Sequence, residues 1–139
     1  MPSYIPDGYT KEAFISPSLQ ESNGETFHDG LEFVFRPATR QEIVTLDAAV
    51  KIASRNSDVD PSAAWAAESL INNFVASHVQ SWSLKAADIH PLAVDVKTIE
   101  RMHPLLFSKL YGVVRGTRLP DKKPGATEDP KLDADQTKN

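Results

Sequence analysis

The sequence contains no cysteine among its 139 residues, which excludes disulfides, thiolate nucleophiles and cysteine-based zinc sites. It also lacks any apolar run of the ~20 residues that a membrane-spanning helix needs. The first residues, from Met1 to Tyr4, do not show the basic-then-apolar order of a signal peptide. We therefore expect a soluble protein that is not exported, has no membrane partner and folds by packing alone in a reducing cytoplasm.

Positive charge is also scarce. Lys and Arg number 15 against 19 Asp and Glu, which gives a formal net charge of −4 and a pI of about 5.5. Nucleic-acid binding depends on clustered Lys and Arg that displace counterions from phosphates. The acidic balance therefore argues against nucleic acid as a partner.

No motif for catalysis or metal binding is present. None of the four histidines lies four residues from another on one helix, and no cluster of carboxylates completes a metal shell around them. A Gly-x-Ser-x-Gly elbow and a phosphate-binding loop are both missing. We expect no catalytic residue, no metal site and no cofactor, and hence a protein that is not an enzyme. A favourable interaction with a helix dipole explains His78, which falls in the last turn of an expected helix.

Proline and glycine divide the chain into three parts. Residues 1–30 hold enough of these breakers to exclude a long helix, so they are predicted to form an arm with short extended pieces. Residues 117–139 hold too few large apolar side chains to offset an ordering entropy of ~1–2 kcal/mol per residue, which predicts a disordered polar tail. The ordered core domain is expected to span residues 31–116.

Two strands and several helices are expected within this core. The alternation in Leu31–Arg36 predicts a strand with Leu31, Phe33 and Phe35 on one side. The capping box from Thr39 to Glu42 starts a helix, and Asp60-Pro61 starts a second helix that runs to about His78.

The second half of the core is predicted in the same way. Val79–Leu84 alternates as a strand that can pair with Leu31–Arg36. Asp95 caps a short helix, and Pro104 starts another helix that ends before Gly116. The fold class is therefore α+β and α-rich, with three or four helices on a small antiparallel sheet or hairpin.

Four apolar residues are candidates for contact with another protein. Trp65 projects from the polar side of its helix, so it packs under the arm or meets a partner. Trp82 is explained as a core aromatic whose indole N–H is bonded to a backbone carbonyl, with contact on an outer strand as the alternative. Leu105 and Tyr111 belong to a helix that is apolar over more than half its circumference and is therefore buried or shared.

The order of these features resembles the small tail assembly chaperones of long-tailed bacteriophages and prophages. The likeness covers about residues 30 to 118. It is carried by a Phe-rich strand with an Arg-Pro step, a Trp strand with a Pro-Leu turn, a Pro-containing helix and a closing Val-Val-Arg-Gly-Thr, namely residues 33–39, 81–84 with 90–92, 96–110 and 113–117. The arm before residue 30 is longer than this pattern needs.

The resemblance implies a non-catalytic protein in the cytoplasm of a bacterial host. It would bind the tape-measure protein, keep its apolar helices soluble and recruit tail-tube subunits during assembly. In that family a ribosomal frameshift often extends the product. Two alternatives remain open: a head-tail joining or minor virion protein, and a small ligand-binding or enzymatic domain that uses His78, His103 and nearby carboxylates. The sequence leaves the oligomeric state open, including a homo-oligomer.

Overall fold

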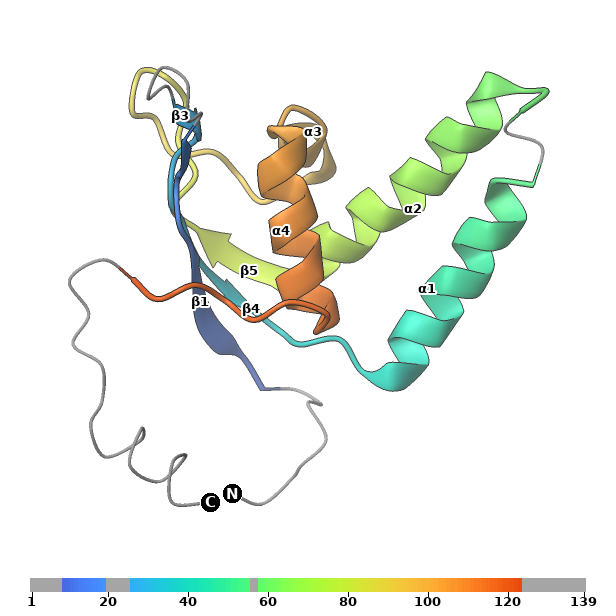
Figure 1. The fold of residues 1–139 in the computed structure, drawn as a ribbon, viewed down its shortest axis with the longest axis horizontal. Coiled ribbons are helices and arrows are strands. Elements are labelled where there is room, and N and C mark those ends of the chain that lie inside the picture. Colours follow the sequence, from blue (N-terminus) through green and yellow to red (C-terminus); the bar gives the residue numbers. More distant parts are fainter. Residues whose placement is uncertain (1–8, 20–25, 56–57, 124–139) are drawn as a thin grey trace.

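A computed structural model describes residues 9–19, 26–55 and 58–123. This part of the chain folds into four α-helices, a three-stranded antiparallel sheet and a short two-stranded one (Figure 1), which confirms the predicted α-rich α+β class. The elements follow in the order β1 (Lys11–Ile15), β2 (Ser18–Leu19), β3 (Thr26–His28), β4 (Leu31–Phe35), α1 (Arg40–Ala53), α2 (Pro61–His78), β5 (Val79–Trp82), α3 (Val96–Glu100) and α4 (Pro104–Arg115).

The main sheet has the strand order β1-β4-β5, with both pairs antiparallel. Phe33 of β4 lies opposite Ala13 on one side and opposite Trp82 on the other. The expected pairing of the two core strands is therefore confirmed. β1 was not expected in this sheet, and its last residue, Ile15, is fully buried. The core thus begins within the predicted arm, and the boundary at residue 30 is corrected to include β1.

The helices begin where local capping chemistry places them. Thr39 and Glu42 form the predicted reciprocal capping box of α1, and Asp60 accepts a hydrogen bond from the Ser62 N–H in front of α2. His103 is the N-cap of α4. That helix ends at Gly116, whose φ of 90° lies in the left-handed region that glycine adopts at low cost.

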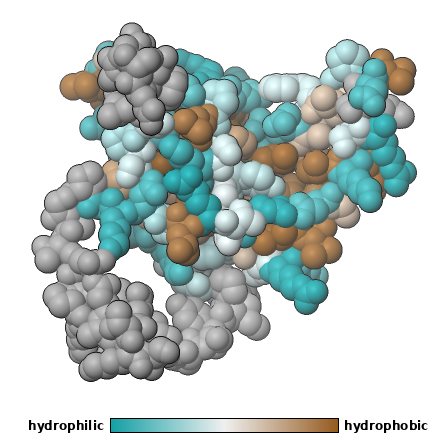
Figure 2. Space-filling model, in the orientation of Figure 1, coloured by the Kyte–Doolittle hydropathy of each residue, from teal (hydrophilic) through white to brown (hydrophobic). Residues whose placement is uncertain are grey.

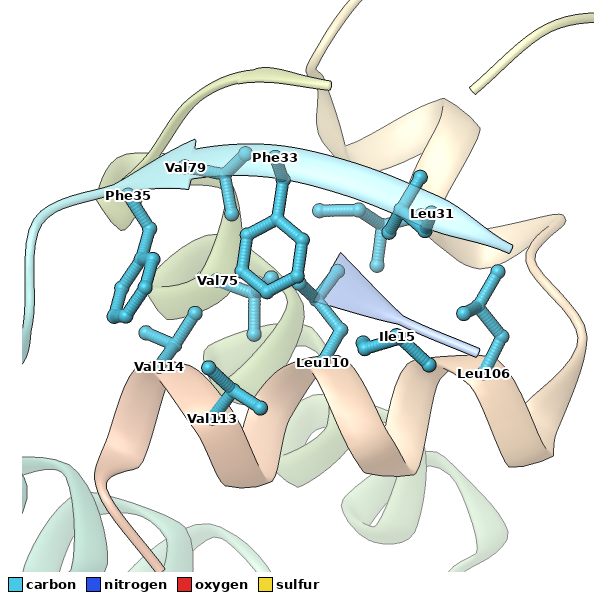
Figure 3. Packing of buried hydrophobic residues seen from close by; sticks show 11 residues of the cluster. Ile15, Leu31, Phe33, Phe35, Val75, Val79, Leu106, Leu110, Val113 and Val114 are labelled. Carbon is cyan, nitrogen blue, oxygen red and sulfur yellow. The ribbon is translucent and has the colours of Figure 1, made fainter. Parts of the chain in front are cut away.

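The hydrophobic core lies between the main sheet and the helices α2 and α4. Leu31, Phe33 and Phe35 point from β4 toward Leu110 and its neighbours on α4 (Figure 3), as the two-residue period of the strand requires. Each side chain buried in this way contributes about 1.5–3 kcal/mol relative to an exposed one. The buried cluster consists of Ile15, Leu31, Phe33, Phe35, Val75, Val79, Ile99, Leu106, Leu110, Val113 and Val114.

Residues 117–123 continue from α4 and pass along β1. The backbone N–H of Asp121 donates to the Phe14 carbonyl over 2.8 Å, and its carboxylate accepts from the Ser16 N–H over 2.9 Å. The predicted tail therefore makes defined contacts in its first seven residues, which corrects its start. The rest of that tail (124–139) and parts of the predicted arm (1–8 and 20–25) lie outside the described residues.

α1 and α2 form an antiparallel hairpin that extends away from the sheet and α4 (Figure 1). α1 packs almost entirely against α2, whereas the second half of α2 also meets α3, α4 and β5. None of the helices in the described part of the chain has the length and apolarity to cross a membrane. The hairpin therefore presents one side of α1 that no other described element covers.

Candidate protein-binding surface

A polar junction fastens the base of the hairpin to the sheet. Arg36, just after β4, donates two hydrogen bonds of 2.9 Å to the Glu42 carboxylate at the start of α1. The backbone N–H of Arg36 also donates to the carbonyl of His78, the last residue of α2, over 2.7 Å. Three separate elements therefore meet at Arg36. Hydrogen bonds from Arg36 are the main reason that the pKa of Glu42 lies far below its ordinary value of 4.5.

The imidazole of His78 is buried within this junction. Its Nδ1 lies 2.8 Å from the Phe74 carbonyl, which can only accept, so Nδ1 carries the proton. Nε2 lies 2.9 Å from the Arg36 guanidinium, which can only donate, so Nε2 accepts. The ring is thus the neutral tautomer that completes the junction. The helix dipole explains only part of the role of His78. Its contacts with Arg36 and Glu42 could not be inferred from the sequence.

The uncovered side of α1 carries an apolar stripe. Val44, Ala48 and Ile52 follow one another at intervals of four residues, which places them on one helix face. All three are exposed, Val44 to 59% and Ile52 to 61%. Single exposed apolar residues are common on protein surfaces, but an aligned set on one helix indicates a contact surface.

A groove runs between α1 and α2 beside this stripe. Its volume is 490 Å³, and it is open to solvent along its length. Side chains of both helices form its apolar floor and its polar rim, and the lining residues are Gln41, Glu42, Thr45, Leu46, Ala49, Leu70, Phe74, Ser77 and His78. The polar junction therefore closes one end of the groove.

The stripe and the groove are parts of one surface. Thr45 lines the groove, and it lies one turn before Ala48 and two turns before Ile52 on α1. We call this combined area, the stripe Val44–Ala48–Ile52 with the adjoining groove, the α1 surface. Hydrophobic residues are visible over the hairpin in the space-filling view (Figure 2). The area has the elongated form that a second helix can cover.

Trp65, on the polar side of α2, is exposed to 57%. It does not belong to the α1 surface, because the residues of α2 that line the groove lie on the opposite side of that helix. Asn72 lies two turns further along on the side of Trp65 and is only 6% exposed. The rest of the protein therefore covers the half of α2 that carries Asn72, although the side chains on this side of the helix are polar.

The other predicted contact residues are integrated into the fold to different degrees. Trp82 is half-buried against the core, and its indole N–H donates to the Leu92 carbonyl over 2.8 Å, as expected for a core aromatic. Leu105 is exposed to 37% at the start of α4. Tyr111 stacks on Phe107 and packs edge-on against Phe74. Through Phe74, Tyr111 touches a residue that lines the groove.

The histidines named for an enzymatic alternative do not lie together. His78 belongs to the junction, whereas His103 lies beside His28, with ring centroids 6.1 Å apart. These two rings line a separate hollow of 630 Å³ between the β3–β4 turn, the segment after β5 and the start of α4. Within the described ranges, no group of three His, Asp or Glu side chains is placed to hold a metal ion.

His28 is buried in the wall of this hollow. Its Nδ1 bonds to the Asp29 carbonyl over 2.9 Å, and its Nε2 lies 3.0 Å from Lys109 Nζ. Burial is the largest cause that lowers the pKa of His28 below 6.5, and the nearby positive charge of Lys109 acts in the same direction. The ring therefore accepts a hydrogen bond from Lys109 in its neutral form, which is a structural role.

Sequence reasoning missed the α1 surface, although a signal was present. In the sequence, Ile43, Leu46 and Val50 repeat at helical spacing and predict one apolar face for this helix. Val44 and Ile52 lie outside that face. A helix with apolar residues on two sides needs two partners, and the hairpin supplies only α2.

Comparisons with protein families, with curated proteins and with solved structures gave no match to this chain.

Proposed function

We propose that this protein is a non-catalytic binding protein that takes an amphipathic helix of another polypeptide onto its α1 surface. The observation that carries the proposal is the exposed stripe of Val44, Ala48 and Ile52 on a helix that is packed on one side only. Helix-in-groove recognition uses apolar anchors at intervals of three and four residues, which is the spacing of this stripe.

The small residue at the centre of the stripe favours a helical partner. Ala48 leaves a low point between Val44 and Ile52, so the backbone of a second helix can approach closely there. The groove beside it accepts side chains against Leu46, Ala49 and other apolar groups. The junction at the base holds the hairpin in place before the partner arrives, which lowers the ordering cost of binding.

Within this class we propose a phage tail assembly chaperone that acts in the cytoplasm of the bacterial host. Its partner would be the long, helical tape-measure protein, with tail-tube subunits recruited during assembly. The layout of the sequence supports this assignment, and so does a surface suited to covering exposed apolar helices. A chaperone leaves the finished particle. Recovery of the chain in stoichiometric amounts from purified virions would count against this role and favour a head-tail joining or minor virion protein.

The binding surface is tested by two matched variants. Val44→Asp/Ile52→Asp places charge on the stripe, whereas Val59→Asp places it on the turn after α1, where Val59 is 88% exposed. Binding of a fluorescein-labelled amphipathic helical peptide to the full chain is measured by anisotropy. We expect the stripe variant to bind at least about tenfold more weakly, since each truncated anchor is worth about 1 kcal/mol or more. The control should bind like the wild type.

Stability is measured on the same variants by urea denaturation. Surface substitutions of this kind usually change the free energy of unfolding by no more than about 0.5 kcal/mol. Unchanged peptide affinity in a folded Val44→Asp/Ile52→Asp protein would refute the proposed surface.

A further inference from the structure

Charged residues flank the apolar stripe of α1 on one side. Arg40, Asp47 and Lys51 share a helix row with Val44, at intervals of four, three and four residues. The other side of the stripe carries the neutral Thr45. A helix that docks on the stripe therefore meets a row of ionic groups along this border.

The single acidic group of this row is already paired with a cation. Both oxygens of Asp47 accept from the Arg115 guanidinium, at 2.7 and 2.6 Å. This hydrogen bonding is the main cause that lowers the pKa of Asp47 and raises that of Arg115. Asp47 therefore remains ionised and is held toward α4.

The two cations of the row are left without such partners. Neither Arg40 nor Lys51 makes a hydrogen bond or ion pair through its side chain with any residue in the described ranges. The border of the stripe is thus positive, although the whole chain has a formal charge of −4. The local sign is opposite to the overall one.

The helix dipole accounts for one of these cations and not for the other. Lys51 lies in the last turn of α1, where the negative end of the helix favours a positive charge. Arg40 is the first residue of α1, where the same dipole disfavours a positive charge. The stability of the isolated helix therefore does not explain the presence of an arginine at position 40.

We propose that the partner of the α1 surface is an acidic amphipathic helix, whose carboxylates pair with Arg40 and Lys51 while its apolar side covers the stripe. This inference rests on the proposed function and specifies the partner's charge. The two cations are 11 positions apart on α1, a rise of about 16 Å at 1.5 Å per residue. A helix that lies along α1 therefore places the two carboxylates about 11 positions apart.

Two labelled peptides test this charge preference. Both are helical, about 20 residues long, and share one apolar face. One carries Glu and the other Lys at two border positions 11 residues apart. Their anisotropy is measured with the full-length protein in low and in high salt. Exposed ion pairs contribute modestly, so we expect the Glu peptide to bind about threefold to tenfold more tightly in low salt, with the difference shrinking in high salt.

Charge reversal on the protein supplies the second arm. Arg40→Glu/Lys51→Glu should invert the preference, so that the Lys peptide binds more tightly. Lys97→Glu, on the exposed surface of α3, makes half the charge change elsewhere and should leave the preference as it is. Urea denaturation of each variant confirms that it is folded.

The outcomes separate the two proposals. Equal affinities for both peptides, unchanged by Arg40→Glu/Lys51→Glu but lost in Val44→Asp/Ile52→Asp, would overturn the acidic partner and leave the binding surface intact. If the Glu peptide still binds more tightly to the charge-reversed protein, the ionic contact lies elsewhere. This result would also overturn the acidic partner. Absence of binding by both peptides would contradict both proposals.

Discussion

The Nε2 atom of His78, the last residue of α2, lies 3.2 Å from a carboxylate oxygen of Glu42 in the first turn of α1. Arg36 donates to both groups. The two ends of the hairpin that are nearest the sheet are therefore fixed by one polar junction. The carboxylate of this junction is only partly shielded from water, because the Glu42 side chain is 32% exposed.

Replacing Glu42 by Gln should lower the free energy of unfolding by about 1–2 kcal/mol at neutral pH, a value reduced by the partial exposure of the pair. The folded-state pKa of Glu42 lies well below 4.5. Its contribution to stability is therefore complete above pH 4.5 and is lost as the pH falls toward the folded value. Urea denaturation between pH 7 and pH 3 measures this dependence.

The control for this experiment is Glu68→Gln, which removes an exposed carboxylate elsewhere on α2. It should retain the wild-type loss of stability in acid, whereas Glu42→Gln should show a shallower loss. Parallel pH profiles for the wild type and Glu42→Gln would show that the junction does not depend on this charge.

Acid should also destabilise the protein through His28. Burial lowers the pKa of this histidine below 6.5 in the folded state. As the pH falls below 6.5, the unfolded chain takes up a proton that the folded chain resists, so stability falls until the pH passes the lowered pKa. We expect an NMR titration of the His28 ring to give a pKa below 6.5, and His28→Gln to flatten the stability profile in this window. A ring pKa above 6.5 would contradict the buried, neutral role.

β1 should prove to be a core strand despite its place in the predicted arm. Ile15 is fully buried, so Ile15→Ala should cost about 2–5 kcal/mol through lost burial and the cavity that remains. Ile52→Ala is the matched control, because Ile52 is 61% exposed and its replacement should change stability little. Equal effects of the two substitutions in urea denaturation would mean that β1 is not part of the core.

Trp65→Ala should affect association more than folding. The side chain is 57% exposed and lies outside the buried cluster, so we expect a loss of no more than about 1 kcal/mol of unfolding free energy. Sedimentation equilibrium of wild-type and variant protein tests self-association through Trp65. A loss of about 3 kcal/mol or more would identify Trp65 as a core residue.

The elements that were predicted correctly depend on a few neighbouring residues. The side chains of Thr39 and Glu42 accept hydrogen bonds from each other's backbone N–H groups, and this pairing needs no distant residue. The start of α2 at Asp60-Pro61 likewise depends on neighbouring residues alone. β1 was harder to predict because its apolar alternation is obscured. Ile15 faces the core, but Phe14 lies on the other face of the sheet, opposite Glu32. Its pairing with β4 is a long-range contact that a local pattern does not encode.

The same reasoning explains why the candidate surface was not predicted. The sequence shows apolar residues such as Val44 and Leu46 on opposite sides of α1, but which side remains open depends on where α2 lies. Leu46 is covered and Val44 is not. Trp82 was a candidate because its side chain is large and aromatic. Its indole N–H proves to be hydrogen-bonded within the fold.

The hydrogen bonds of Asp121 at the outer edge of β1 have a consequence for aggregation. An unpaired outer strand is a template on which copies of a protein can add strand to strand into fibrils. Asp121 occupies that position on β1 by bonding to Phe14 and Ser16. In the main sheet of the described residues, β5 is the strand at the opposite border. A second copy therefore meets less obstruction at β5 than at β1.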